Sequence, residues 1–209
     1  MTGPGKSAAW DIGMQVLRER LTTVARREKG LSYEVSFDWV TPEPTASDSV
    51  IWVDAREGQE TEVAGILWDT ARTLATFGPT EDEIAHEVAA FRELVEDPRT
   101  IEADLDLRAR TELLGQPYHS GEDWLTRLAA VTPDQVAEAM SGGLRTALLV
   151  VPEPYELELS DVDGKPIPLG GCVRDTTVPD GQVFRPSLRA RMVNGAARRA
   201  QRSDRKSVV

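Results

Sequence analysis

The sequence contains one cysteine and two histidines among its 209 residues, which limits the metal and redox chemistry open to it. A single thiol, Cys172, excludes an internal disulfide and a thiolate metal cluster, and we interpret it as a buried or incidental side chain. A zinc hydrolase needs about three protein ligands. No second histidine lies three or four residues from His86, so neither H-E-x-x-H nor H-x-x-E-H is present, and His119 stands alone in an expected loop. We therefore expect no metal ion bound by this chain.

Several other common signatures are missing. The sequence has no G-x-x-x-x-G-K-[ST] phosphate loop, no G-x-G-x-x-G after a strand and no G-x-S-x-G elbow. No apolar run approaches the roughly 20 residues that a membrane-spanning helix requires. The first thirty residues carry no basic start followed by an apolar block. We therefore expect a cytoplasmic protein without a membrane partner.

The negative charge of the chain is unevenly distributed. Eight basic residues but only one acid lie between Arg185 and the end of the sequence. Residues 1–184 keep 16 of the 24 basic and 34 of the 35 acidic residues, a net charge of −18 against −11 for the whole chain. A body this acidic repels nucleic-acid phosphates, so we expect no nucleic-acid partner. Contact of the basic end with RNA or a membrane surface is a weaker alternative to a solvated tail.

Hydrophobic residues with a spacing near 3.6 predict a helix over residues 8–28. The same periodicity, interrupted at glycine and proline, predicts further helices. These cover about residues 59–77, 80–96, 98–114, 122–130 and 132–140. Thr80 and Glu83 have the spacing of a capping box, and Thr132 before Pro133 is typical of a helix start.

Strict alternation of apolar and polar side chains predicts a strand over residues 31–40, with Tyr33 on its apolar face. A polar turn at 41–49 joins it to a second strand at 50–54. The two strands are expected to form an antiparallel hairpin.

A Gly-Gly turn at 142–143 is expected to lead into a last, buried strand at 144–151. Because strands and helices are segregated along the chain, the pattern predicts an α+β fold with an antiparallel sheet packed on one face by helices. Residues 1–151 form this domain in our interpretation, 152–188 a Pro/Gly-rich extended appendage, and 189–209 a basic, disordered tail.

The segment Arg26-Arg27-Glu28-Lys29-Gly30-Leu31-Ser32-Tyr33 joins the first predicted helix to the first predicted strand. It resembles the L-R-E-x-x-G-L-A-Y segment in the second half of peptidase family M16, the insulinase, pitrilysin and mitochondrial processing peptidase group. The hairpin, the F-G-P-T-E-D-E-I helix start and the A-A-V-T-P-D-Q-V-A-E-A-M helix follow in the order seen in that family. The resemblance covers about residues 8–151.

This resemblance implies one M16-type half, which closes with a second half around an unfolded peptide. In the family, the zinc half holds the metal through H-x-x-E-H and a further Glu, while the other half supplies an Arg and a Tyr seven residues apart. Arg26 and Tyr33 match those two positions. A phenol hydroxyl and a cation can stabilise the oxyanion of a tetrahedral intermediate, and the cation can hold a peptide carbonyl. The resemblance thus implies that Arg26 and Tyr33 are catalytic and substrate-binding, with zinc on the partner subunit.

Structural interpretations of the same residues remain open, and the chain departs from the family pattern. Arg26 at a helix C-terminus would be stabilised by the helix dipole, and Arg27 could take the inward-facing place instead. Tyr33 could be a core residue with a satisfied hydroxyl.

Around residues 1–7 the strand and the G-G-G-x-S-S-R-L stretch that precede the first helix in the family are missing. A missing strand leaves a sheet edge open, to be covered by residues 152–188 or by a partner chain.

Two functions follow from these observations. The chain is either the non-zinc subunit of a two-chain M16-type zinc metallopeptidase, or a catalytically inactive M16-like assembly or peptide-binding protein. The expected partners are a zinc-bearing M16 subunit with H-x-x-E-H, or further copies of this chain, together with a peptide. Since the zinc ligands are missing, this chain is at most the accessory half of a metalloendopeptidase.

Overall fold

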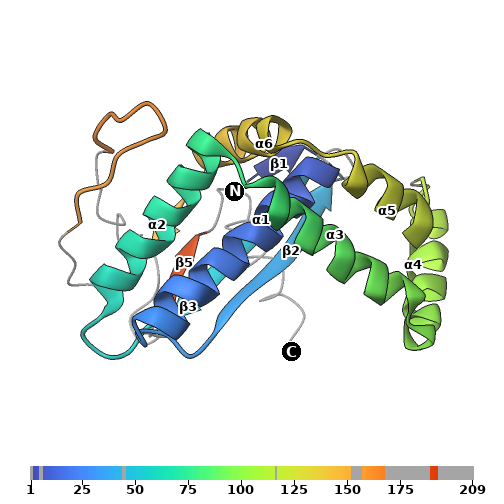
Figure 1. Cartoon of the computed structure of the whole chain (residues 1–209), viewed down its shortest axis with the longest axis horizontal. Helices are drawn as coiled ribbons and strands as arrows, with labels where there is room; N and C mark the ends of the chain where they lie inside the picture. Colours follow the sequence, from blue (N-terminus) through green and yellow to red (C-terminus); the bar gives the residue numbers. More distant parts are fainter. Residues whose placement is uncertain are drawn as a thin grey trace, which may run out of the picture.

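The structure is a computed structural model, which describes residues 2–4, 7–43, 46–115, 117–151, 157–167 and 189–192. Six α-helices and five strands lie in this part of the chain (Figure 1). Their order follows the sequence-based prediction, with one strand added near each end of the chain.

The first helix, α1, runs over Ala8–Leu21 and continues as a π-helix, η1, over Thr22–Glu28. The Ser7 hydroxyl accepts a hydrogen bond from the Trp10 backbone N–H and so caps the start of α1. Apolar side chains along α1 are buried, namely Trp10, Ile12, Met14, Val16, Leu17 and Leu21. The helix predicted over 8–28 is confirmed, although its last part departs from α geometry.

Two long antiparallel strands, β2 (Val35–Glu43) and β3 (Ala46–Asp54), form a hairpin in which β3 is the inner strand of the sheet. Their register places Phe37 opposite Ile51. The pairing continues well into residues 41–49, where the sequence predicted a turn, so that prediction is wrong for most of the segment.

Two short strands pair with the other edge of β3. β1 (Thr2–Pro4) lies against its first part and β5 (Arg189–Met192) against its last part, and β5 also pairs with β4 (Leu149–Val150). The expectation of a missing strand before α1 is therefore wrong, because β1 occupies that place. Among the described residues, β1 and β5 cover this edge of β3, and most of 152–188 lies outside the described residues. Disorder was expected for 189–209, yet its first four residues are strand because they complete the backbone ladder of β3.

The helices after the hairpin are α2 (Glu60–Phe77), α3 (Glu81–Glu96), α4 (Ile101–Leu113), α5 (Gly121–Ala129) and α6 (Pro133–Arg145). A 3-10 turn, η2 (Pro98–Thr100), precedes α4. Thr80 with Glu83 and Thr132 with Gln135 exchange side-chain and backbone hydrogen bonds as capping boxes. The helix starts predicted at these two threonines are confirmed.

The Gly-Gly pair at 142–143 does not form the expected turn, because both glycines lie inside α6. A Cβ atom on Gly143 would lie 2.3 Å from ring atoms of Trp10, so only glycine lets α6 approach α1 this closely. The glycine therefore serves helix packing, and the strand predicted at 144–151 is reduced to Leu149–Val150.

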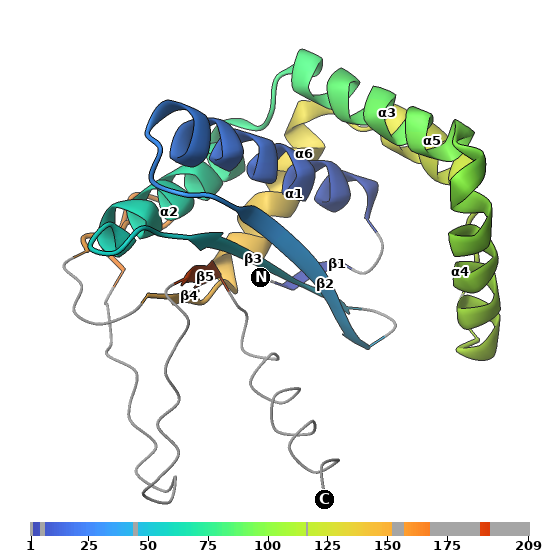
Figure 2. The same cartoon turned by 90° about the horizontal axis from the view of Figure 1, so that it is seen from below.

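The helices form two groups. α1, α2 and α6 pack together and cover one face of the sheet, with the core between the two layers (Figure 2). α3 and α5 lie side by side and extend away from the sheet, with α4 at the far end; we call α3, α4 and α5 the helical arm (Figures 1 and 2). In the described part of the chain, no helix combines the length and apolar character needed to cross a bilayer. The predicted α+β fold, with helices on one face of an antiparallel sheet, is confirmed.

Candidate functional site

Arg26 lies in the π-helix η1, where the backbone closes wider turns than in an α-helix. The Lys29 N–H donates to the Val24 carbonyl at 3.1 Å, five residues back. The Arg26 side chain is exposed, and it makes no ion pair with any residue that the structure describes. Arg27, the alternative candidate, pairs with Glu19 at 3.0 Å. π-Helical turns are rare and recur at functional sites. The location of Arg26 in such a turn therefore supports its place among the candidate site residues.

Tyr33 points outward from the fold. Gly30 ends the helix with φ of +63°, a conformation that favours glycine, and Leu31 then packs against the core. Ser32 is buried, whereas Tyr33 is 67% exposed. The interpretation of Tyr33 as a core residue on the apolar face of its strand is therefore wrong. The alternation does not extend to it, because β2 begins only at Val35.

The carboxylate of Asp54, at the end of β3, holds the segment that carries Tyr33. Its Oδ1 atom accepts three hydrogen bonds, from the Ser32 hydroxyl at 2.7 Å, the Tyr33 backbone N–H at 2.9 Å and the Glu34 backbone N–H at 2.7 Å. The Asp54 N–H donates in turn to the Glu34 carbonyl at 3.2 Å. The backbone of Tyr33 is thus fixed to the sheet while its phenol remains exposed to solvent.

A second guanidinium lies beside Tyr33. The Arg56 guanidinium carbon is 5.2 Å from the centre of the Tyr33 ring, within the range of a cation–π contact. The Arg56 backbone N–H donates to the Leu31 carbonyl at 3.1 Å, which fixes the start of its side chain next to the same segment. The sequence analysis missed Arg56, because nothing in the local pattern links residue 56 to residue 33.

The end of η1 is also tied to the helix layer. Lys29 Nζ binds Glu62 of α2 at 2.7 Å. The Lys29–Glu62 pair thus links the end of η1 to α2, while Asp54 of β3 holds the backbone of Tyr33. The exposed phenol hydroxyl can donate a hydrogen bond, and the Arg26 and Arg56 guanidinium groups can bind a carbonyl or an anion.

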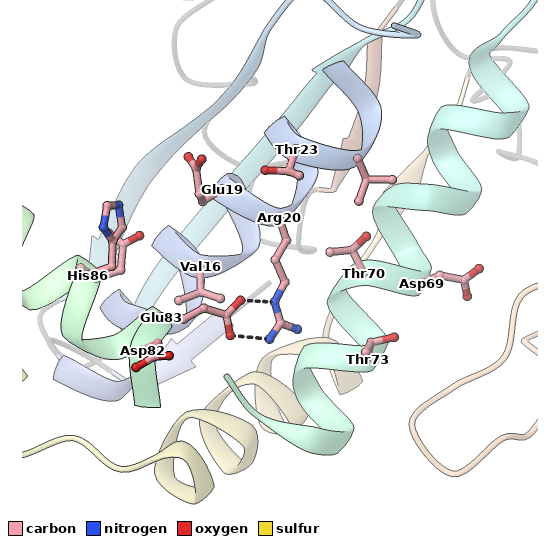
Figure 3. A pocket seen from close by; sticks show the side chains of 12 residues that line it. Val16, Glu19, Arg20, Thr23, Asp69, Thr70, Thr73, Asp82, Glu83 and His86 are labelled. Carbon is pink, nitrogen blue, oxygen red and sulfur yellow. Dashed lines mark hydrogen bonds and ion pairs between the residues drawn. The ribbon is translucent and has the colours of Figure 1, made fainter. Parts of the chain in front are cut away.

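A separate groove of about 580 Å³ lies between α1, α2 and α3. Arg20 of α1 lines this groove, and Figure 3 shows its side chain bound to both carboxylate oxygens of Glu83. The hydrogen bonds from Arg20 are the main reason that the pKa of Glu83 falls from 4.5 to about 2. Burial instead raises the pKa of Glu87, four residues further along α3. The sequence analysis did not predict this groove, because its walls come from helices that are distant in sequence.

Neither histidine lies in a metal centre within the part of the chain that the structure describes. His86 is an exposed residue at the groove, as expected for a solvent-facing helical histidine, and His119 stacks on Trp124 with ring centres 6.2 Å apart. Cys172 lies outside the described residues. Across the described ranges, no three His, Cys, Asp or Glu side chains come together as a metal site. These residues therefore do not fit a zinc ion.

The comparison with solved structures identifies the fold. A peptidase M16 inactive domain from Pseudomonas fluorescens matches with a TM-score of 0.54 and 23% identity, over 66% of this chain and 35% of that chain. The first half of the periplasmic protease PqqL from Escherichia coli matches with a TM-score of 0.51 and 19% identity, over 68% and 35%. A predicted insulinase family protease from Yersinia pestis matches with a TM-score of 0.51 and 12% identity, over 69% and 36%.

No protein-family model and no curated protein matches the sequence. The matched part of this chain spans about a third of each of the three solved structures. The resemblance that the sequence analysis drew from residues 8–151 is confirmed at the level of the fold. The chain has the fold of one half of an M16-type peptidase.

Proposed function

We propose that this chain is the non-zinc subunit of a two-chain M16-type metallopeptidase. In this proposal Arg26 binds a carbonyl of the substrate backbone, and the Tyr33 hydroxyl donates a hydrogen bond to the oxyanion of the tetrahedral intermediate. A partner subunit with H-x-x-E-H holds the zinc ion. The observation that carries the proposal is the presentation of Tyr33, which is 67% exposed on a backbone held by three hydrogen bonds to Asp54.

The exposure of the Tyr33 ring, which gives up the stability gained by burial, supports a role in binding. A tyrosine ring gains stability when it is buried, and the Tyr33 side chain, 67% exposed, forgoes most of that gain. The chain instead packs a partly buried Leu31 against the core and exposes Tyr33, whose backbone N–H donates to the Asp54 carboxylate. A fixed donor that needs no reorganisation is what oxyanion stabilisation requires.

The sheet offers a place for the substrate backbone. Among the described strands, β2 pairs only with β3, so its second edge is open next to the segment that carries Tyr33. An extended peptide can add to such an edge by backbone hydrogen bonds. We propose that the peptide lies along β2, which would bring its carbonyl groups past Tyr33.

A catalytically inactive M16-like protein that binds peptides or assembles with other subunits is the alternative. It is favoured by one of the matched structures, which is described as an inactive domain. This alternative predicts peptide binding at Arg26 and Tyr33 without hydrolysis by any complex that contains the chain.

The deciding experiment is to purify the chain from its source cells with its bound proteins and to assay chelator-sensitive peptide hydrolysis. We expect a partner with H-x-x-E-H, and a fall of roughly 10²-fold or more in kcat for Tyr33→Phe, as for loss of one oxyanion donor. Tyr118→Phe is the matched control, because Tyr118 bonds to Asp104 on the helical arm. Full hydrolysis by the Tyr33→Phe complex would exclude the proposed role of the phenol.

Arg26 is tested in the same assay. Arg26→Ala is expected to raise KM and lower kcat, because the carbonyl contact acts on both the bound substrate and the transition state. Arg27→Ala is the control, since Arg27 is paired with Glu19 on the helix surface. Equal effects of the two variants would show that the site does not depend on Arg26 in particular.

A further inference from the structure

The helix at the far end of the arm, α4, has few contacts with the rest of the protein. Thr111 is the one buried residue of its 13. One side of the helix contacts Tyr118, whose hydroxyl donates to the Asp104 carboxylate at 2.8 Å while Arg108 lies over its ring at 5.7 Å. Figure 2 shows the helix hanging from the end of the arm, away from the sheet. The residues on the side turned away from Tyr118 are exposed in the described part of the chain.

That side carries exposed apolar side chains. It comprises Asp106, Ala109, Arg110, Leu113 and Leu114, which line a shallow groove of about 410 Å³, and we call it the outer face of α4. Leu113 is 87% exposed and Leu114 57% exposed. Leucine side chains this exposed along one helix face are typical of a protein–protein contact.

We propose that two copies of this chain associate through the outer faces of their α4 helices, packed antiparallel about a two-fold axis. The charges of α4 favour a second copy of this chain as the partner. Asp106 and Arg110 are four residues apart on the outer face, both are exposed, and neither has an ion pair with a described residue.

The antiparallel arrangement makes this surface complementary to itself. In a two-fold pair centred on residue 108, Asp106 of one copy lies opposite Arg110 of the other, and the symmetry repeats the pair. In the same register Leu113 of one copy lies opposite Ala103 of the other, so an apolar pair flanks the charged pairs at each end of the contact. A parallel arrangement would place like charges side by side, which is unfavourable.

The length of α4 sets the expected strength of the contact. A helix of 13 residues is about 20 Å long, so the contact lies at the small end of specific interfaces, below roughly 1,200 Å² in total. The pair is therefore reversible and weakens on dilution through the micromolar range. This inference goes beyond the proposed peptidase function, because it involves neither Arg26 nor Tyr33.

Sedimentation of the purified full chain over a range of concentrations tests the proposal. The wild-type chain is expected to shift from monomer to dimer as its concentration rises, and Leu113→Glu is expected to weaken the dimer at least tenfold. Phe77→Glu is the matched control, because Phe77 is an equally prominent apolar side chain, 78% exposed, on α2. Circular dichroism checks that each variant keeps its helices. A wild-type chain that stays monomeric throughout, or a dimer that Leu113→Glu leaves intact, would overturn the proposal.

A charge exchange tests the antiparallel geometry itself. Asp106→Arg and Arg110→Asp are each expected to weaken the dimer, because each places two like charges opposite each other. The double variant restores both opposite-charge pairs and is expected to dimerise like the wild type. Failure of the double variant to recover would reject the pairing of Asp106 with Arg110.

Discussion

The guanidinium of Arg20 in α1 binds both carboxylate oxygens of Glu83 in α3, with Nε to Oε1 at 2.7 Å and Nη2 to Oε2 at 2.8 Å. The same carboxylate accepts a hydrogen bond from the Thr80 backbone N–H at 2.7 Å. Glu83 therefore has two roles, since it completes the cap of α3 and attaches the helical arm to the helix layer. Such bidentate, charge-assisted pairs are stronger than single hydrogen bonds between neutral groups.

Glu83→Gln is expected to destabilise the protein, since it weakens the bonds to Arg20 and Thr80 together. We expect a loss of about 1–2 kcal/mol in the free energy of unfolding, measured by urea denaturation at neutral pH. Glu87→Gln is the matched control on the same helix. The pKa of Glu87 is raised by burial, so removal of its charge is expected to leave stability unchanged or slightly higher. Equal losses of unfolding free energy in Glu83→Gln and Glu87→Gln would contradict a specific stabilising role of the Glu83 carboxylate.

The ion pair also predicts an acid-dependent loss of stability. The pKa of Glu83 is lowered from 4.5 to about 2, chiefly by the hydrogen bonds from Arg20. A lowered carboxyl pKa contributes stability above the unfolded value, and that contribution is lost as the pH falls from about 4.5 toward 2. The difference in unfolding free energy between wild type and Glu83→Gln should therefore shrink over this interval. A difference that stays constant down to about pH 2.5 would refute the linkage.

Gly143→Ala is expected to disrupt the contact between α6 and α1. The new Cβ would lie 2.3 Å from the Trp10 ring, so the ring or the helix must move, at a cost of about 1–3 kcal/mol. Gly142→Ala is the neighbouring control, because a Cβ there meets no atom within 4 Å. That variant should gain about 0.5–1 kcal/mol from helix propensity. Thermal unfolding of the two variants, compared with wild type, checks the predicted opposite signs.

Asp54→Ala is expected to release the segment that carries Tyr33. Three donors lose their acceptor. The free energy of unfolding is expected to fall by only about 1–2 kcal/mol, because water can replace Asp54 at the two exposed N–H groups. The direct measurement is hydrogen exchange, in which the amides of Tyr33 and Glu34 should lose protection. Asp69→Ala is the control. The Asp69 side chain is 66% exposed, and its contact with Arg72, at 3.6 Å, is a weak surface ion pair. Unchanged protection in Asp54→Ala would show that other contacts hold the turn.

Local patterns in the sequence predicted much of the fold. The helix over 8–28 and the capped helix starts at Thr80 and Thr132 depend on spacing within a few residues, and the structure confirms them. The missed features depend on distant partners. Glycines that normally end a helix lie within α6, because Trp10 of α1 packs against Gly143. β1 and β5 were missed because their pairing with β3 has no local signature.

In the candidate site too, local features were predicted from the sequence and features that depend on distant residues were not. The seven-residue spacing of Arg26 and Tyr33 is visible in the sequence, but the exposure of Tyr33 is not. The backbone of Tyr33 is held by the carboxylate of Asp54, which is 21 residues away along the chain. The catalytic roles of Arg26 and Tyr33, the boundaries at 151 and 188, and the cytoplasmic location stay predictions.

The pairing of β5 with β3 has a consequence for biosynthesis. Residues 189–192 leave the ribosome long after residues 51–54, against which they pair. Until then the last part of β3 presents an unpaired edge, and such edges can join the edges of other nascent chains. Contacts between segments this distant in sequence also slow folding. The helix layer can therefore form during translation, whereas the sheet is completed only once residues 189–192 have emerged.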